Sequence, residues 1–227
     1  MDMPRVILHN AVSADGRVDW FPADIALFYE LAATWHEDAT LAGSGTILAS
    51  GGSAEDPAAP AATPPERAAA HVGDDRRPIL AVVDSRGQVK GWRTLLGAGY
   101  WRAGVALCSA TTSAAHLAWL AERGVDRIVS GADRVDLAAA LGELASRFGV
   151  RTVRVDSGGT LNGELLRLGL VDEISLLVHP YLVGGSSPAS MFQAVNLVHE
   201  VGVLQLELLQ SRKVKQGMVW LRYAVKP

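Results

Sequence analysis

The sequence predicts an α/β fold in which helices cover a mixed, mostly parallel sheet that ends in an antiparallel hairpin. Short apolar runs alternate with segments of helical spacing between residues 78 and 179, as expected for parallel strands joined by helices. Glycine or hydroxyl residues follow most of these runs and mark the strand ends. Residues 203–212 and 218–224 alternate around a Lys-Gln-Gly turn, which is the pattern of two antiparallel strands.

Length and composition favour a single domain over residues 1–227. Of the 227 residues, 49% are hydrophobic and 20% are charged, which is sufficient for a substantial core. The net charge of −3 comes without a basic stripe, so nucleic acid is not an expected partner. The single cysteine, Cys108, excludes an intramolecular disulfide, and no Cys/His cluster has zinc-ligand spacing. We therefore expect a cytoplasmic protein without a metal, and no apolar run is long enough to cross a bilayer.

The N-terminal region predicts a strand at residues 5–11 and a helix at residues 20–35. Asp24 falls in the first turn of that helix, where a carboxylate is favoured by the helix dipole. Helical spacing places Phe28 on the same face as Asp24, one turn further on. Asp24 is then either an N-terminal cap or a partly buried acid that hydrogen-bonds a ligand, with Phe28 against a flat ring.

The middle of the chain predicts alternating elements after one irregular segment. Residues 39–50 are expected as a strand broken at residues 43–46 and followed by a short helical or irregular piece. Residues 50–76 are rich in Ala, Pro and Gly, cannot supply a packed core, and are expected to form a flexible loop. The remaining predicted elements are strands at 78–85, 105–109, 127–130, 150–155 and 174–179 and helices at 114–123, 137–148 and 161–168.

The stretch DSGGTLNGELL, residues 156–166, joins the strand at 150–155 to a helix. The paired glycines Gly158 and Gly159 allow a ligand to approach the main chain, and the helix start presents backbone N–H groups and a positive dipole end. A dinucleotide pyrophosphate would suit this junction. Taken alone, the same two glycines are equally compatible with a plain turn.

Together these segments resemble the dihydrofolate reductase-like fold, most closely the riboflavin-biosynthesis pyrimidine reductases, over nearly the whole chain. The resemblance is carried by NAVSADGRV (10–18), GSGT (43–46), VVDS (82–85), DSGGTLNGELL (156–166) and GLVDEISLLVHPYLVGG (169–185). WFPADIALF (20–28) resembles the dihydrofolate reductase segment that bears the substrate-binding acid. The resemblance implies a three-layer α/β/α architecture, an NADPH-dependent oxidoreductase and a homodimer.

The resemblance also implies roles for particular residues. The NADPH pyrophosphate would lie near Gly158, Gly159, Thr160 and Leu161, with main-chain contacts from Gly45 and Thr46, and with Ser85 and Arg86 at the adenosine 2′-phosphate. An Arg fork beside a hydroxyl suits phosphate geometry. The catalytic candidates are Asp24 and Asp156, and the substrate-binding candidates are Asn10, Ser13, Asp24, Phe28 and Asp156.

The expected reaction is direct hydride transfer to a pyrimidine- or pterin-type substrate, most like that of 5-amino-6-(5-phosphoribosylamino)uracil reductase. Two features depart from the pyrimidine reductases. Asp156-Ser157 stands in place of a glutamate and a glycine, and the Ala/Pro-rich segment replaces an acidic, Pro-containing one. A dihydrofolate or pteridine reductase and a non-catalytic nucleotide-binding protein of the same fold are the alternatives. Arg17, Arg93 and Arg102 are candidates for a substrate phosphate by charge alone.

Overall fold

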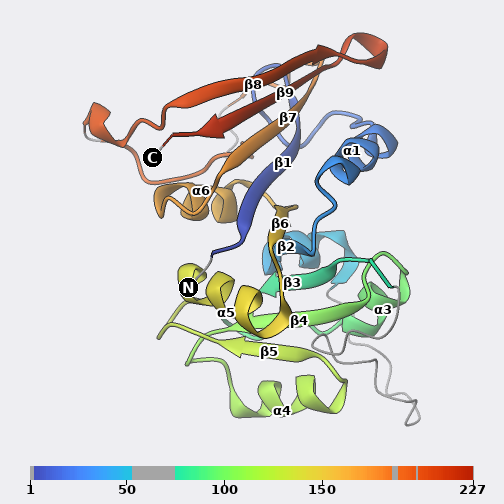
Figure 1. Cartoon of the computed structure of the whole chain (residues 1–227), viewed down its shortest axis with the longest axis vertical. Helices are drawn as coiled ribbons and strands as arrows, with labels where there is room; N and C mark the ends of the chain where they lie inside the picture. The colour runs from blue at the N-terminus through green and yellow to red at the C-terminus, as the bar shows by residue number, and fades with distance from the viewer. Residues whose placement is uncertain (1–2, 53–74, 186–188, 198, 227) are drawn as a thin grey trace. The chain divides into compact units, whose positions relative to one another are not determined.

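The computed structural model describes residues 3–52, 75–185, 189–197 and 199–226 (Figure 1). Most of the loop predicted at residues 50–76 lies outside them. The chain divides into two compact units. The first comprises Met1–Pro4 and Glu37–Val153, and the second comprises Arg5–His36 and Arg154–Pro227.

Strands and helices alternate along both units. The first unit contains β2 (Ala39–Gly43), α2 (Ser44–Ile47), η2 (Leu48–Gly52), β3 (Ile79–Val83), α3 (Trp92–Gly97), β4 (Ala103–Cys108), α4 (Ala114–Glu122), β5 (Asp126–Val129) and α5 (Leu137–Phe148). The second contains β1 (Arg5–Ser13), α1 (Ile25–Ala32), η1 (Ala33–Trp35), α6 (Gly159–Arg167), β7 (Glu173–His179), η3 (Glu200–Gly202), β8 (Leu206–Lys213), η4 (Lys215–Gly217) and β9 (Val219–Val225). The chain passes from the first unit to the second within β6 (Thr152–Val155).

The strands of the first unit are all parallel and lie in the order β5-β4-β3-β2. β3 and β4 carry continuous apolar runs that are buried on both faces, as parallel strands covered by helices should be. A core cluster joins Leu80 and Val82 of β3 to Trp92 of α3 and Leu120 of α4. The predicted parallel α/β arrangement is confirmed in this unit.

The strands of the second unit lie in the order β1-β7-β9-β8, with β1 parallel to β7 and the last two strands antiparallel. The predicted C-terminal hairpin is therefore confirmed. Successive side chains of a strand point to opposite faces. Ile7 on one face of β1 packs in a cluster with α1, whereas Asn10 on the other face contacts α6, so α1 and α6 cover opposite faces of β1 (Figure 1).

Two predicted elements differ from those observed, and one observed helix was not predicted. The helix expected at residues 20–35 is shorter: α1 begins after Asp24, which caps it, and Trp20 has a positive φ of 65° that no α-helix accommodates. Residues 44–47 form the helix α2 itself instead of only interrupting a strand. α3 was not predicted, because its short sequence lacks a helical period.

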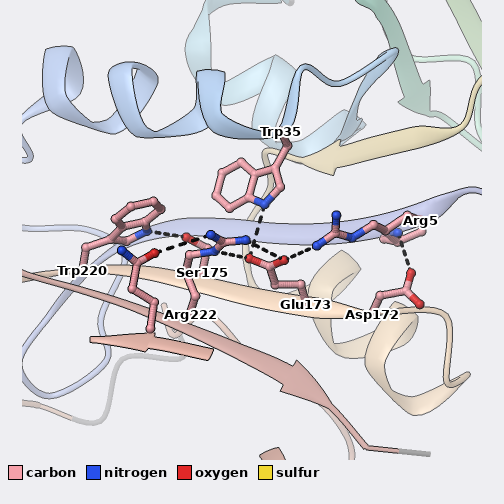
Figure 2. A network of polar contacts seen from close by, with 9 residues as sticks. Arg5, Trp35, Asp172, Glu173, Ser175, Trp220 and Arg222 are labelled. Atoms are coloured by element: carbon pink, nitrogen blue, oxygen red, sulfur yellow. Dashed lines mark hydrogen bonds and ion pairs between the residues drawn. The ribbon is translucent and has the colours of Figure 1, made fainter. Parts of the chain in front are cut away.

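A buried carboxylate organises the amino-terminal ends of β1 and β7 (Figure 2). Glu173 is only 1% exposed and accepts hydrogen bonds from Arg5 Nη2 at 2.5 Å, Arg222 Nε at 2.5 Å and Trp35 Nε1 at 3.3 Å. Beside it, the Asp172 carboxylate accepts the backbone N–H of Val6 at 2.7 Å. A buried carboxylate needs such partners, because its desolvation is otherwise very unfavourable.

A chain of hydrogen bonds begins next to this carboxylate and ends on α1. The Trp220 indole donates to Ser175 Oγ at 2.8 Å, and Ser175 Oγ lies 2.9 Å from Nδ1 of the buried His9. His9 Nε2 lies 3.0 Å from the Phe28 carbonyl, which can only accept, so Nε2 carries the proton and Ser175 donates to Nδ1. Burial lowers the pKa of His9 to about 4, which keeps it neutral at physiological pH.

Candidate functional site

The turn from β6 to α6 leaves the start of the helix without a side-chain cap. Gly158 occupies the N-cap position with an extended backbone, φ −82° and ψ 178°, and the first turn contains no acidic residue. A Cβ added to Gly158 would meet no atom within 4 Å, so open space lies beside this backbone. A helix start of this kind, with its main chain approachable, can hold an anion.

Gly159 serves a different purpose from its neighbour. A Cβ at Gly159 would overlap the carbonyl oxygen of Ser190, and a Cβ at Gly163, one turn later, would overlap that of Gln193. Gln193 N also donates to Gly159 O at 3.0 Å. These two glycines therefore let residues 190–193 lie directly on the backbone of α6, whereas open space lies beside Gly158. Contact of Gly158 and Gly159 with a cofactor stays a prediction.

Two asparagines tie this turn to β1. Asn10 Nδ2 donates to the Ser157 carbonyl at 2.9 Å, and Asn162 Nδ2 of α6 donates to Asn10 Oδ1 at 2.9 Å. Asn162 Nδ2 also lies 2.9 Å from the Met191 carbonyl. Asn10, predicted to line the substrate pocket, is 7% exposed, and its Oδ1 and Nδ2 both have protein partners.

Asp156 presents a carboxylate at the same turn. Its Oδ2 lies 3.0 Å from Nη1 of the buried Arg154 and 3.4 Å from the Tyr29 hydroxyl. The Asp156 side chain is 29% exposed, so it stays accessible while Arg154 orients it. Arg154 also lies over the Tyr29 ring, at 5.7 Å from its centroid. The three side chains form one polar cluster with Tyr29 half exposed.

Asp24 acts as the N-cap of α1, which is one of the two predicted roles. Its Oδ1 accepts the Leu27 N–H at 2.9 Å, and its Oδ2 pairs with Lys215 Nζ at 2.9 Å. These two contacts, the backbone N–H first, lower the pKa of Asp24 below its usual value. Its backbone N–H donates to Nε2 of His179 at 3.0 Å. Asp24 is thus held as a carboxylate at the carboxyl end of β7.

Ser13 belongs to a turn in which Asp15 is the central acceptor. Ser13 Oγ donates to Asp15 Oδ1 at 2.6 Å and accepts the Arg17 N–H at 3.0 Å. Asp15 also accepts the N–H groups of Val183 and Gly184, and the Ser13 hydroxyl with these two amides holds its pKa far below the usual range. Contact of Ser13 with a substrate stays a prediction.

The remaining predicted residues of the second unit have protein contacts. Phe28 is 6% exposed and stacks on His9, with ring centroids 4.2 Å apart and an interplanar angle of 20°. Thr160 Oγ1 donates to Gln193 Oε1 at 3.0 Å, and Leu161 is buried in α6. The ligand contacts proposed for these three residues stay predictions.

Four predicted cofactor residues lie in the first unit. Gly45 and Thr46 belong to α2, and a Cβ at Gly45 would meet no atom within 4 Å. Ser85 and Arg86 follow β3, and Ser85 Oγ accepts the Val135 N–H at 3.1 Å. Arg86 is exposed. Their contact with a cofactor stays a prediction.

Sequence reasoning missed Tyr29, Arg154 and Asn162. Arg154 lies two residues before Asp156, a spacing that puts both on one side of an extended chain, and this signal was available in the sequence. Asn162 lies within the DSGGTLNGELL stretch, but its partner Asn10 is 152 residues away, so no local pattern predicts the pair.

Among the described residues, we find neither a reactive thiol, nor a metal-binding cluster, nor a membrane-spanning helix. Burial raises the pKa of the Cys108 thiol to about 11, which makes it a poor nucleophile. No group of three or more His, Cys, Asp or Glu side chains within the described ranges could hold a metal ion. Nor do the described residues contain a helix that is long and apolar enough to span a membrane.

Comparisons with known proteins identify the family. The chain is 28% identical to the 2,5-diamino-6-ribosylamino-4(3H)-pyrimidinone 5′-phosphate reductase of Methanothermobacter thermautotrophicus, over 98% of this chain and 99% of that one. RibD from Acinetobacter baumannii superposes with a TM-score of 0.68 at 19% identity, over all of this chain and 59% of that chain. Dihydrofolate reductase from Enterococcus faecalis superposes with a TM-score of 0.50 at 11% identity, over 98% of this chain and 97% of that one.

The two solved structures show that the chain has the predicted fold. The chain corresponds to about three fifths of the length of the Acinetobacter protein. The named relative supports an oxidoreductase. The model of the RibD C-terminal domain matches residues 4–220. The chain therefore belongs to the RibD C-terminal domain family.

Proposed function

We propose that this protein is an NADPH-dependent reductase of riboflavin biosynthesis that acts on a ribosylamino-pyrimidine 5′-phosphate. The relative from Methanothermobacter, aligned over almost the full length of both chains, is named as such a reductase. The observation that carries the proposal is the start of α6, where the N-cap residue Gly158 has no side chain and open space lies where a Cβ would stand. These residues fit a dinucleotide pyrophosphate.

The residues of the second unit suggest how the substrate is held. NADPH supplies the hydride when it is bound. Asp156, oriented by Arg154 and partly exposed, would accept hydrogen bonds from the amine or the sugar hydroxyls of the substrate. The Tyr29 hydroxyl lies 3.4 Å from the same carboxylate and the residue is 51% exposed, so its ring would be available to a flat heterocycle. Asp24 is held as a carboxylate and so would accept a hydrogen bond from the heterocycle, without a proton of its own to give.

The cofactor site can be tested with a substitution that the fold itself tolerates. Gly158→Val adds a side chain whose Cβ would meet no atom within 4 Å, so we expect the fold to be retained with only a small decrease in the thermal midpoint. We expect the Kd for NADPH to rise by roughly tenfold or more, because the side chain would stand between the phosphates and the main chain. Titration by fluorescence, compared with NADH and with Arg86→Ala, measures the site and its 2′-phosphate preference. Unchanged NADPH affinity in Gly158→Val would remove the cofactor assignment.

Substrate choice is tested by NADPH oxidation with two candidates. We expect turnover with the ribosylamino-pyrimidine 5′-phosphate and not with dihydrofolate. The opposite preference would support a pteridine reductase. NADPH binding without oxidation in either case would support a nucleotide-binding protein that lacks turnover.

We further propose that the protein works in the cytoplasm as a homodimer. β8 is exposed along nearly its whole length, and Leu208 and Leu209 are 55% and 52% exposed. Such an apolar edge strand favours association. Sedimentation of the wild type and of Leu208→Lys tests this proposal: a wild-type monomer would contradict it, and dissociation of the variant would identify the surface.

A further inference from the structure

We infer that Asn162 is a positioning residue that sets the orientation of the Ser157–Gly158 peptide, and thereby the affinity of the α6 start for a nucleotide phosphate. This inference rests on the function proposed above. Asn162 lies in the second turn of α6 and is completely buried. Its Nδ2 lies 2.9 Å from Asn10 Oδ1, 2.9 Å from the Met191 carbonyl and 3.4 Å from the Ser157 carbonyl.

The orientation of the Asn162 amide follows from its neighbours. The Ser157 and Met191 carbonyls can only accept hydrogen bonds, and Asn10 Oδ1 accepts because Asn10 Nδ2 already donates to Ser157 O. All three neighbours therefore require the Asn162 NH₂ group. A flipped amide would place its oxygen against three acceptors.

This orientation leaves Asn162 Oδ1 without a hydrogen-bond partner among the described residues. An unpaired buried carbonyl is unfavourable, and a leucine would fill a similar volume without it. The benefit of asparagine at this position must then come from its N–H donors, which bind β1, the turn after β6 and the segment at Met191 in one place.

Within this hydrogen-bond network, the β6–α6 turn is the part that would contact a bound phosphate. The Ser157 carbonyl accepts the Asn10 Nδ2 N–H at 2.9 Å, and Asn162 Nδ2 lies 3.4 Å away. The two hydrogens of the Asn162 amide point at Asn10 Oδ1 and the Met191 carbonyl, so Asn162 acts on the Ser157 carbonyl chiefly by orienting Asn10. In a trans peptide the following N–H, that of Gly158, points the opposite way. Through Asn10, Asn162 thus sets the direction of the Gly158 N–H at the helix start, while its own side chain stays buried.

Two substitutions test this role. Asn162→Asp preserves the shape but replaces the donors with a carboxylate that faces three acceptors. Asn162→Leu removes the donors without burying a charge, and it serves if the first variant does not fold. Leu165→Ala is the matched control, because Leu165 is fully buried on the same helix and its truncation lowers stability without removing a hydrogen-bonding group.

We expect both Asn162 variants to raise the Kd and the KM for NADPH by about tenfold with kcat changed less than about twofold, whereas Leu165→Ala binds like the wild type. Binding is measured by titration at a temperature where every variant is folded. Wild-type affinity in the Asn162 variants, or an equal loss in Leu165→Ala, would overturn the inference while leaving the proposed function intact. If the wild type itself binds no NADPH, the proposed function fails, and this inference fails with it.

Discussion

The two ends of β1 and β7 differ in how completely their polar groups are paired. At the amino-terminal end, the Glu173 carboxylate is surrounded by Arg5, Arg222 and the Trp35 indole (Figure 2). In the adjacent chain from Trp220 to His9, each side chain has a hydrogen-bond partner. At the carboxyl end, Asn162 Oδ1 has no partner among the described residues, the α6 start has no side-chain cap, and the Asp156 carboxylate is partly exposed.

This difference separates stability from binding within one sheet. Buried polar groups whose hydrogen bonds are all made within the protein stabilise one packing arrangement, but they have no free donor or acceptor for a ligand. Incompletely paired groups at strand ends lower stability and leave that capacity open. Substitutions at the amino-terminal end should therefore act on the free energy of unfolding, and those at the carboxyl end should act on binding and turnover.

The largest effect is expected from Glu173→Ala. Removing this carboxylate leaves the Trp35 indole unpaired and the partly buried Arg222 guanidinium without a counter-charge, which should lower the free energy of unfolding by about 3–5 kcal/mol. Urea denaturation measures the change. Glu143→Ala, which breaks the exposed ion pair with Arg147, is the control and should cost under about 1 kcal/mol. An equal decrease in the free energy of unfolding in the two variants would mean that the buried Glu173 network stabilises the fold no more than an exposed ion pair does.

His9 should make stability depend on pH. Its pKa is about 4 in the folded protein and 6.5 ordinarily, so between these values the unfolded chain binds a proton that the folded chain does not. Stability contributed by neutral His9 is therefore complete above pH 6.5 and falls as the pH drops toward 4, by about 3 kcal/mol in total. Unfolding by urea at several pH values should show this slope, and His9→Gln should flatten it. An unchanged slope in the variant would assign the effect to other groups.

Asp24→Asn tests the carboxyl end through turnover. Asparagine can still cap α1, but it loses the charge that pairs with Lys215 and that would face a heterocycle. We expect NADPH affinity to stay nearly unchanged and kcat to fall by roughly 10²-fold. If turnover survives, Asp24 is only a cap. Asp24→Ser is a useful companion, because it keeps a capping oxygen without the amide.

The smallest expected effect is a difference in stability between alanine substitutions at the two glycines of the turn. Gly159→Ala places a methyl group against the Ser190 carbonyl and should cost about 1–3 kcal/mol of stability, whereas Gly158→Ala should cost less than about 1 kcal/mol. Thermal unfolding measures both. Equal stabilities would show that residues 190–193 can move away from α6, and that the close packing does not distinguish these positions.

Much of the fold could be predicted because its signals are local. Apolar runs ending at glycines located β3 and β4, and alternation located the hairpin of β8 and β9. The predicted length of α1 was wrong. The sequence allows Asp24 either in the first turn of the helix or at its N-cap, and only the backbone conformation distinguishes these two positions.

The site was less predictable because its contacts are distant in sequence. The apolar run at 150–155 and the DSGGTLNGELL stretch after it correctly predicted a strand, a turn and a helix, but they could not reveal that Gly159 packs against residues 190–193 while Gly158 faces open space. Similarly, Phe28 has the right spacing for a ligand contact, yet the ring of His9, on another element, lies against it.

The hydrogen-bond chain from Trp220 to the Phe28 carbonyl runs in one direction only, since each group donates to the next. The indole N–H of Trp220 and the Nε2–H of His9 should consequently exchange slowly with deuterated solvent and give resolved NMR signals. Because the chain ends on α1, these two protons would report whether that helix is docked, without any label. Ser175→Ala would interrupt the chain and should speed the exchange of both protons together.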